Sequence, residues 1–314
     1  MTYYRSDWPE VGLDAPLNAR DIEDKDSGWS HEKEVSGAKL RWTASQNVFE
    51  SALYGFPIWD ICLMANDPKN HLLNEQLDNK SLHDIVYTET SQILNSPPWT
   101  DAYVSAKLVR GEPLHEALLK LDFTEVEHRR LYACEIGDLR GTPASQFDGS
   151  IRFCSLADIP PEQLSSYQEQ IREICREGFH RGHTRHFADK FLSEKNPGVA
   201  YIVAAMGLNF DHVDPRHFLI AVDEKAARIC GFTVIGKKSW LEENIRTQLL
   251  SAVSKAYRGR GIYRGLTDVL SRTFPPETRL LNVTHVENQK IQRAYQNSGR
   301  IHVADTVVLR RIFV

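Results

Sequence analysis

The residues best suited to chemistry lie in the stretch 251–266, which reads SAVSKAYRGRGIYRGL. An apolar, strand-like start leads into a basic turn with two glycines at 257–261, called the glycine turn below, and a helical pattern begins at Ile262. The first N–H groups of a helix have no acceptor within the helix, so they are available to an anion. Arg258 and Arg260 add fixed positive charge to these donors. The stretch therefore predicts a binding site for a pyrophosphate.

A second stretch, 280–299, reads LLNVTHVENQKIQRAYQNSG and places two polar residues on one helix. An apolar strand ends at a polar turn, and Asn288 stands where the helix begins. Tyr295 follows seven residues later, two turns along the same helix face. Taken alone, Asn288 fits a helix N-cap and Tyr295 fits a core aromatic residue. The pair gains a functional interpretation only in combination with the glycine turn.

Together, the two stretches resemble the GNAT superfamily of CoA-dependent N-acyltransferases, whose acyl-CoA loop follows the pattern Gln/Arg-x-x-Gly-x-Gly/Ala. Here the positions hold Arg258, Gly261 and Tyr263. Tyr263 is a departure, because a bulky ring replaces a small residue and must point away from the phosphates. The resemblance implies acetyl-CoA as cosubstrate and no metal. It implies contacts with acetyl-CoA from Val253, Arg258, Gly259, Arg260, Gly261, Ile262, Tyr263 and Asn288.

The reaction implied by this resemblance is attack of an amine on a thioester. The carbonyl oxygen gains negative charge, and the N–H of Val253 is the expected donor to it. Tyr295 is implied to lie beside the sulfur. A phenol with a pKa of ~10 is a weak acid for a thiol with a pKa of ~8.5. Tyr295 is therefore expected to act partly as a hydrogen-bond donor, with proton transfer completed late.

The sequence identifies the base that removes the proton of the acceptor ammonium less clearly than it identifies the other site residues. His285 lies near the end of a predicted strand and is the candidate catalytic base. A structural histidine is the competing interpretation, because no partner of His285 is visible in the sequence. Glu242, Glu243 and a chain of water molecules are the alternatives.

The segment 178–187, GFHRGHTRHF, is rich in histidine and arginine. Histidines three residues apart rotate away from one another along a helix, and Gly182 disfavours a continuous helix, which argues against a metal site. A loop that contacts an anion fits better, with a solvated basic loop as the alternative. The candidate substrate-binding residues are His180, Arg181, His183 and Arg185.

The composition is that of a globular protein, with 41% hydrophobic and 25% charged residues. No apolar run approaches the ~18–20 residues of a membrane span, and the first residues lack the pattern of a signal peptide. Five scattered cysteines suit neither a disulfide framework nor a zinc site and favour a reducing cytoplasm. The net charge is −4, and residues 1–35 alone carry nine acids and four bases, so no nucleic-acid surface is expected.

A length of 314 residues indicates two domains. We expect an acidic, loosely ordered extension (1–36), a small N-terminal α/β domain (37–140), a turn-rich linker (141–149) and a GNAT domain (150–314). The last segment predicts the element order β-α-α-β-β-β-α-β-α-β, which matches the GNAT order. The predicted fold class is α/β (α+β), with a central mixed, mostly antiparallel sheet flanked by helices.

The stretches 46–64 and 118–127 resemble, more loosely, the N-terminal domain of acetyltransferases that act on nucleotide-linked amino sugars. The predicted function is therefore transfer of an acetyl group from acetyl-CoA to the amine of a nucleotide-linked sugar of the 4-amino-4,6-dideoxyhexose type. The alternatives are a non-sugar amine, a longer acyl donor, and a CoA-binding module without turnover. Neither nucleic acid nor a membrane is an expected partner, and a homodimer stays open.

Overall fold

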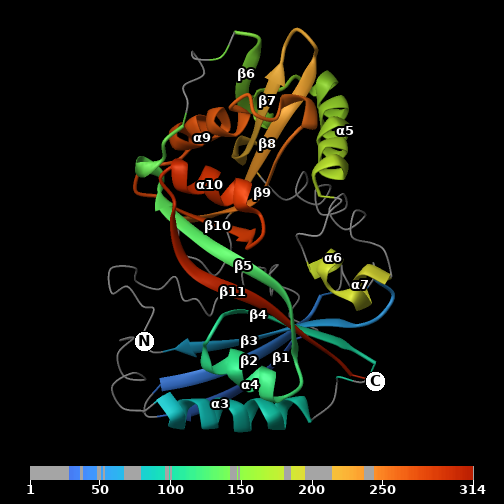
Figure 1. Cartoon of the computed structure of the whole chain (residues 1–314), viewed down its shortest axis with the longest axis vertical. Helices are drawn as coiled ribbons and strands as arrows, with labels where there is room; N and C mark the ends of the chain where they lie inside the picture. Colours follow the sequence, from blue (N-terminus) through green and yellow to red (C-terminus); the bar gives the residue numbers. More distant parts are fainter. Residues whose placement is uncertain are drawn as a thin grey trace. The chain divides into compact units, whose positions relative to one another are not determined.

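The computed structural model describes residues 28–35, 38–47, 51, 54–66, 79–95, 99, 101–141, 147, 149–179, 185–194, 214–236 and 244–313. Within these residues the strands form one mixed sheet of 11 strands, flanked by helices (Figure 1). The strand order is β1-β2-β3-β4-β11-β5-β10-β9-β8-β7-β6. The predicted fold class, a mixed sheet flanked by helices, is confirmed.

The chain divides into two compact units. The first consists of Met1–Arg129 with Ala304–Val314, and the second is Arg130–Val303. Two long strands, β5 (Thr124–Glu135) and β11 (Ile301–Ile312), contribute residues to both units. Of the stretch predicted as a linker, 141–149, the structure describes residues 141, 147 and 149, and these fall in the second unit.

The first unit combines strands and two helices. Its remaining elements are β1 (Gly28–Val35), β2 (Ala38–Gln46), β3 (Ile58–Asn66), α3 (Asn79–Leu94), β4 (Tyr103–Val109) and α4 (Pro113–Lys120). The strand β1 pairs with β2 along all of its 8 residues, so 28–35 is not part of a loose extension. Its sequence, GWSHEKEV, shows no clear alternation of apolar and polar residues, so the strand could not be predicted from the sequence.

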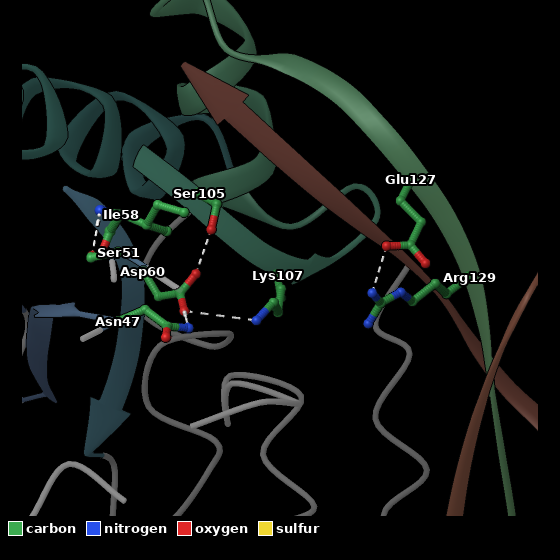
Figure 2. A network of polar contacts seen from close by, with 8 residues as sticks. All are labelled: Asn47, Ser51, Ile58, Asp60, Ser105, Lys107, Glu127 and Arg129. Atoms are coloured by element: carbon green, nitrogen blue, oxygen red, sulfur yellow. Dashed lines mark hydrogen bonds and ion pairs between the residues drawn. The ribbon is translucent and has the colours of Figure 1, made fainter. Parts of the chain in front are cut away.

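The strand β4 separates an apolar face from a polar one, because successive side chains point to opposite sides. Val104, Ala106 and Leu108 pack in one core cluster with residues of α3 and α4. On the other face Asp60 of β3 accepts a hydrogen bond from Ser105, and Lys107 Nζ lies 3.8 Å from Asp60 Oδ2 (Figure 2). The helices of this unit therefore cover the apolar face.

The second unit contains the stretches that carry the predicted chemistry. Its elements are β6 (Ile151–Ser155), α5 (Pro161–Gly178), α6 (Arg185–Ala188), α7 (Lys190–Glu194), β7 (Phe218–Asp223), β8 (Arg228–Gly236), β9 (Ile245–Val253), α9 (Ile262–Thr273), β10 (Arg279–His285) and α10 (Gln289–Asn297). They follow the predicted order closely. The helix predicted at 197–206 lies outside the described residues.

The helices α5 and α9 pack on opposite faces of β7 and β8. Alternate residues of β7 separate into two core clusters: Ile220 packs in the cluster of α5, and Leu219 packs in that of α9. Ile262, Leu266 and Leu270, spaced by four residues, form the buried stripe of α9. This packing fixes the start of α9 at the end of the glycine turn.

The two units repeat one series of elements. In each, two antiparallel strands of 9 residues (β2 and β3; β8 and β9) come before a strand of 7 residues (β4; β10) that runs parallel to the second of them. A short helix and a strand of 12 residues (β5; β11) follow. The parallel pairing covers four residue pairs in both units and begins at the first residue of each strand.

The ends of α4 and α10 match residue by residue. The N–H of Phe123 donates to the carbonyl of Leu118 at 3.0 Å, and the N–H of Arg300 donates to that of Tyr295 at 3.1 Å. The residue before each donor has a positive φ, 61° in the first unit and 92° in the second. Phe123 and Arg300 therefore hold the same place in the repeat, as do Leu118 and Tyr295.

Candidate functional site

The glycine turn leaves backbone donors available at the start of α9. Gly259 and Gly261 both have a φ of +79°, a conformation that residues with a side chain rarely adopt. Gly261 is the N-cap of α9. The N–H groups of Ile262 and Tyr263, at the start of the helix, have no acceptor among the described residues. The turn can therefore donate these hydrogen bonds to a ligand.

Exposed basic side chains surround this turn. They are Lys255, Arg258, Arg260 and Arg264. None of the four forms an ion pair with a carboxylate in the described part of the chain. Arg258 Nε donates to the carbonyl oxygen of Val253 at 3.1 Å, and the Arg260 guanidinium lies 5.2 Å from the centre of the Tyr257 ring. Their charge is free to bind an anion, with helix N–H groups beside it.

The strands β9 and β10 part before either one ends. Their parallel pairing stops at Gln248 and Asn282, and beyond that point β9 is paired with β8. A register shift between β8 and β9 leaves Leu249 bulged directly after the last parallel pair. A bulge bends a strand and raises its twist, which provides a physical reason for the parting.

The parting exposes a backbone donor on β9. The N–H of Ser254 donates to the carbonyl of Cys230 in β8 at 2.8 Å. Because N–H groups alternate in direction along an antiparallel strand, the N–H of Val253 points away from β8, towards the side where β10 no longer pairs. Val253 thus offers a donor at an open strand edge, four residues before the basic turn begins at Tyr257.

A buried polar network fills the point of parting. Asn282 donates to Gln248 Oε1, and Arg300 Nε donates to Asn282 Oδ1 at 3.0 Å. Arg300 Nη2 also lies 3.4 Å from Gln248 Oε1. Asn282 is fully buried and Arg300 is 2% exposed. The last pair of the parallel ladder is therefore polar and connected to a buried guanidinium.

Tyr295 packs against this network. It is 6% exposed, and its ring centre lies 5.4 Å from that of Tyr132 and 6.2 Å from that of Tyr263. The Tyr263 hydroxyl lies 3.4 Å from Gln248 Oε1, so its ring is directed into the interior, as the predicted loop requires. The Arg300 guanidinium lies 5.2 Å from the centre of the Tyr295 ring. Tyr295 and the glycine turn are thus linked through Tyr263.

Burial raises the pKa of Tyr295 well above its usual range, and the neighbouring Tyr263 acts in the same direction. The positive charge of Arg300 and a hydrogen bond with Asn282 act in the opposite direction. A raised pKa means that the phenol keeps its proton over a wider pH range. Tyr295 is therefore a hydrogen-bond donor throughout the neutral and mildly alkaline range.

Asn288 and His285 both make local backbone contacts. Asn288 is the N-cap of α10, and its Oδ1 accepts from the N–H of Ile291 at 3.4 Å. His285 Nδ1 accepts from the N–H of Glu287 at 3.2 Å. A neutral imidazole that accepts at Nδ1 carries its proton on Nε2. The one lone pair that could take up a proton, on Nδ1, is therefore already used by the N–H of Glu287. The contact favours the structural interpretation of His285.

Several predicted residues fall outside the described part of the chain. They are His180, Arg181 and His183 of the basic loop and the alternative bases Glu242 and Glu243. Arg185 begins α6, but its side chain is not described. Among the described residues, no group of three or more His, Cys, Asp and Glu side chains is arranged to hold a metal ion. None of the described helices is long and apolar enough to cross a membrane.

A pocket of about 480 Å³ lies beside the residues that precede the turn. Its walls come from α5, the start of β8 and residues 254–257. Its two acidic residues, Glu173 and Glu177, offset the positive charges of Arg228 and Lys255, so this pocket is less suited to a phosphate than the turn itself.

No family model matches this sequence, and no curated protein matches it. Solved structures do match it. The GCN5-related N-acetyltransferase from Sphaerobacter thermophilus aligns with a TM-score of 0.51 and 13% identity, over 88% of this chain and 80% of that chain. The fold is that of the GCN5-related N-acetyltransferases.

A second solved structure with this fold is the GCN5-related glucosamine N-acetyltransferase region of a fungal multi-domain GH3 β-N-acetylglucosaminidase. It aligns with a TM-score of 0.50 and 11% identity, over 87% of this chain and 33% of that chain. The predicted GNAT fold is thus confirmed. In this chain the glycine turn lies between β9 and α9, as the predicted order requires.

The sequence did not single out Gln248, Asn282, Arg300 or Tyr132. A polar residue inside an apolar strand, as in the pattern around Gln248, is the one local signal that was available. Arg300 has no such signal, because an arginine after a glycine at the start of a strand is ordinarily exposed. Its burial depends on the packing of β9, β10 and α10, which no local pattern contains.

The pKa of Tyr295 can be tested directly. Alkaline titration followed by phenolate absorbance should show no signal from Tyr295 below about pH 10, because its pKa is raised. The signal of Tyr295 is the difference between the wild type and Tyr295→Phe. The half-exposed Tyr87 provides the control, since Tyr87→Phe also removes one phenol but leaves the surroundings of Tyr295 unchanged. A difference for Tyr295 that titrates below about pH 10 would contradict the raised pKa.

Proposed function

We propose that this protein is an N-acyltransferase that moves an acetyl group from acetyl-CoA to an amine, with its site in the second unit. One observation carries the proposal. Helix N–H groups without an acceptor among the described residues, together with exposed basic side chains, lie next to the open edge of β9. The buried Tyr295 lies where β9 and β10 part. The fold supports it, since both solved structures compared above are described as N-acetyltransferases.

The turn is proposed to bind the pyrophosphate of acetyl-CoA. The N–H groups of Ile262 and Tyr263 donate to it, and Arg258 and Arg260 supply charge. Asn288, at the start of α10, is proposed as a further contact because its side-chain amide N–H₂ has no acceptor among the described residues. The thioester then lies towards the parting of β9 and β10.

The proposed reaction uses no covalent enzyme intermediate. The lone pair of the amine forms the C–N bond, and the carbonyl oxygen accepts a hydrogen bond from the N–H of Val253 as it gains charge. The C–S bond breaks, its electron pair moves to sulfur, and Tyr295 donates a hydrogen bond and then a proton to the thiolate. The amine loses its extra proton to solvent; His285 could act as the base only if its Nδ1 were released from the N–H of Glu287.

The cysteines support direct transfer. Burial raises the pKa of the Cys134 and Cys154 thiols to about 11 and that of the Cys175 and Cys230 thiols to about 12. These groups are therefore protonated thiols near neutral pH, and a thiol is a poor nucleophile compared with a thiolate. An acyl-cysteine intermediate on any of the four is disfavoured.

The acceptor is proposed to be a nucleotide-linked amino sugar of the 4-amino-4,6-dideoxyhexose type. The stretches 46–64 and 118–127, and the end of α10 from Tyr295 to Gly299, resemble those of dTDP-fucosamine acetyltransferase. An amino-sugar acetyltransferase region also occurs on this fold. In this proposal Arg181 and Arg185, with His180 and His183, contact the diphosphate of the nucleotide. A non-sugar amine or a longer acyl group are the alternatives.

The first test concerns the donor. Acetyl-CoA at a hundredfold excess over its Kd should stabilise the wild type by ~2.7 kcal/mol, measured as a thermal shift. Gly261→Val should abolish this shift, because a side chain at a φ of +79° distorts the turn. The matched control is Gly111→Val, which places the same side chain at a φ of +87° in the first unit. An unchanged affinity of Gly261→Val for acetyl-CoA would rule out the turn as its site.

The second test concerns the acid. Tyr295→Phe keeps the ring and removes the hydroxyl, so kcat should fall ~10²-fold or more while the affinity for acetyl-CoA changes little. Steady-state kinetics and a CoA thermal shift on the same variant separate the two effects. A kcat within about threefold of the wild type would exclude the assigned role.

The third test concerns the acceptor. Arg181→Ala and Arg185→Ala should each raise the KM for a dTDP- or UDP-linked 4-amino-4,6-dideoxyhexose about tenfold, because each arginine–phosphate contact contributes about 1.5–3 kcal/mol. The KM for acetyl-CoA should not change, and the effect should shrink in high salt. Equal efficiency on the nucleotide sugar and on the free amino sugar would show that the phosphates are not recognised.

A further inference from the structure

Arg300 carries a buried charge that no carboxylate of the described residues neutralises. Its side-chain partners are the neutral groups of Asn282, Ser298 and Gln248 and the faces of two tyrosine rings. Among the described residues no acid forms an ion pair with it. A buried charge is costly without a counter-ion, so its retention calls for a reason.

The first unit shows that the fold does not require an arginine at this place. The matching residue in the repeat is Phe123, which packs in the apolar core of that unit. The polar pair that contacts Arg300, Gln248 and Asn282, also differs from the matching pair in the first unit. Gln248 and Asn282 end the parallel ladder of the second unit, whereas Ile61 and Ala106 end that of the first, and both are core residues. The polar network is thus specific to the unit that carries the glycine turn.

We propose that Arg300 is a positioning residue for Tyr295, and that its positive charge stabilises the negative charge that forms beside Tyr295 when the thioester is cleaved. This role rests on the proposed acyl transfer. The charge lies 5.2 Å from the centre of the Tyr295 ring and 5.9 Å from that of Tyr263. Asn282 connects the two groups, since it accepts from Arg300 and hydrogen-bonds with Tyr295.

The reaction supplies the anion that the resting protein lacks. When the C–S bond breaks, its electron pair leaves a negative charge on sulfur. As the proton of Tyr295 moves to that sulfur, the charge moves to the phenolic oxygen, and the phenol regains a proton from the acceptor ammonium through solvent. A fixed cation in a water-poor site stabilises both anions without reorganisation.

The test combines substitutions at Arg300 with Tyr295→Phe. Arg300→Phe installs the residue of the matching position, and Arg300→Met is measured in parallel so that the result does not depend on the fit of a ring. Each should lower kcat ~10²-fold, with the KM for acetyl-CoA within about threefold of the wild type. Arg300→Lys keeps the charge and should recover most of that loss. Arg272→Met, at an exposed arginine near the end of α9, is the control and should leave kcat unchanged.

The double variants separate positioning from general packing. If Arg300 acts through the Tyr295 hydroxyl, Arg300→Phe or Arg300→Met should lower kcat by less than about threefold in the Tyr295→Phe background.

Thermal unfolding adds a measurement that needs no turnover: Arg300→Phe should raise the midpoint of thermal unfolding, because it removes an unpaired buried charge. Equal kcat losses in both backgrounds, or a kcat of Arg300→Met within threefold of the wild type, would overturn the proposal. If the wild type transfers no acyl group, the proposed function fails, and the unfolding midpoint still decides whether the unpaired charge is costly.

Discussion

The proposed site depends on the parting of β9 from β10. A parallel pair that stays together uses the backbone donors of both strands, and no ligand can then bind between them. Here the pairing stops at Gln248 and Asn282, a bulge at Leu249 follows, and Val253 keeps an N–H that points away from β8, towards the side where β10 no longer pairs. The turn at the end of β9 adds further unpaired donors and positive charge. One break in a ladder thus places the open edge and the proposed anion site close together in the sequence.

The internal repeat separates what the fold needs from what the site needs. Both units have the same series of strands, the same parallel register and the same helix ending. In the first unit the matching positions hold Ile61, Ala106 and Phe123, which pack in an apolar core. In the second unit these positions are polar. A polar network costs stability at a position where apolar side chains also fit, so its presence favours a function over a structural need.

Local patterns were sufficient for much of this fold. The stripe of Ile262, Leu266 and Leu270 predicted α9, and the two glycines before it predicted the turn. The edge strand β1 could not be predicted, because its eight residues show no clear alternation of apolar and polar residues. Its pairing with β2, which runs along its whole length, is visible only in the structure. The burial of Arg300 could not be predicted, because it is decided by residues distant in sequence. The internal repeat could not be predicted for a similar reason, since its matching positions share places in the fold but not residue types.

The central claim is that acetyl-CoA binds along the turn and the open edge of β9, with its sulfur beside Tyr295. A crystal structure of the wild type with bound acetyl-CoA tests this most directly. The account predicts the pyrophosphate within hydrogen-bond distance of the N–H groups of Ile262 and Tyr263, and the sulfur within hydrogen-bond distance of the Tyr295 hydroxyl. Acetyl-CoA bound elsewhere on the chain, or a sulfur out of reach of Tyr295, would contradict it.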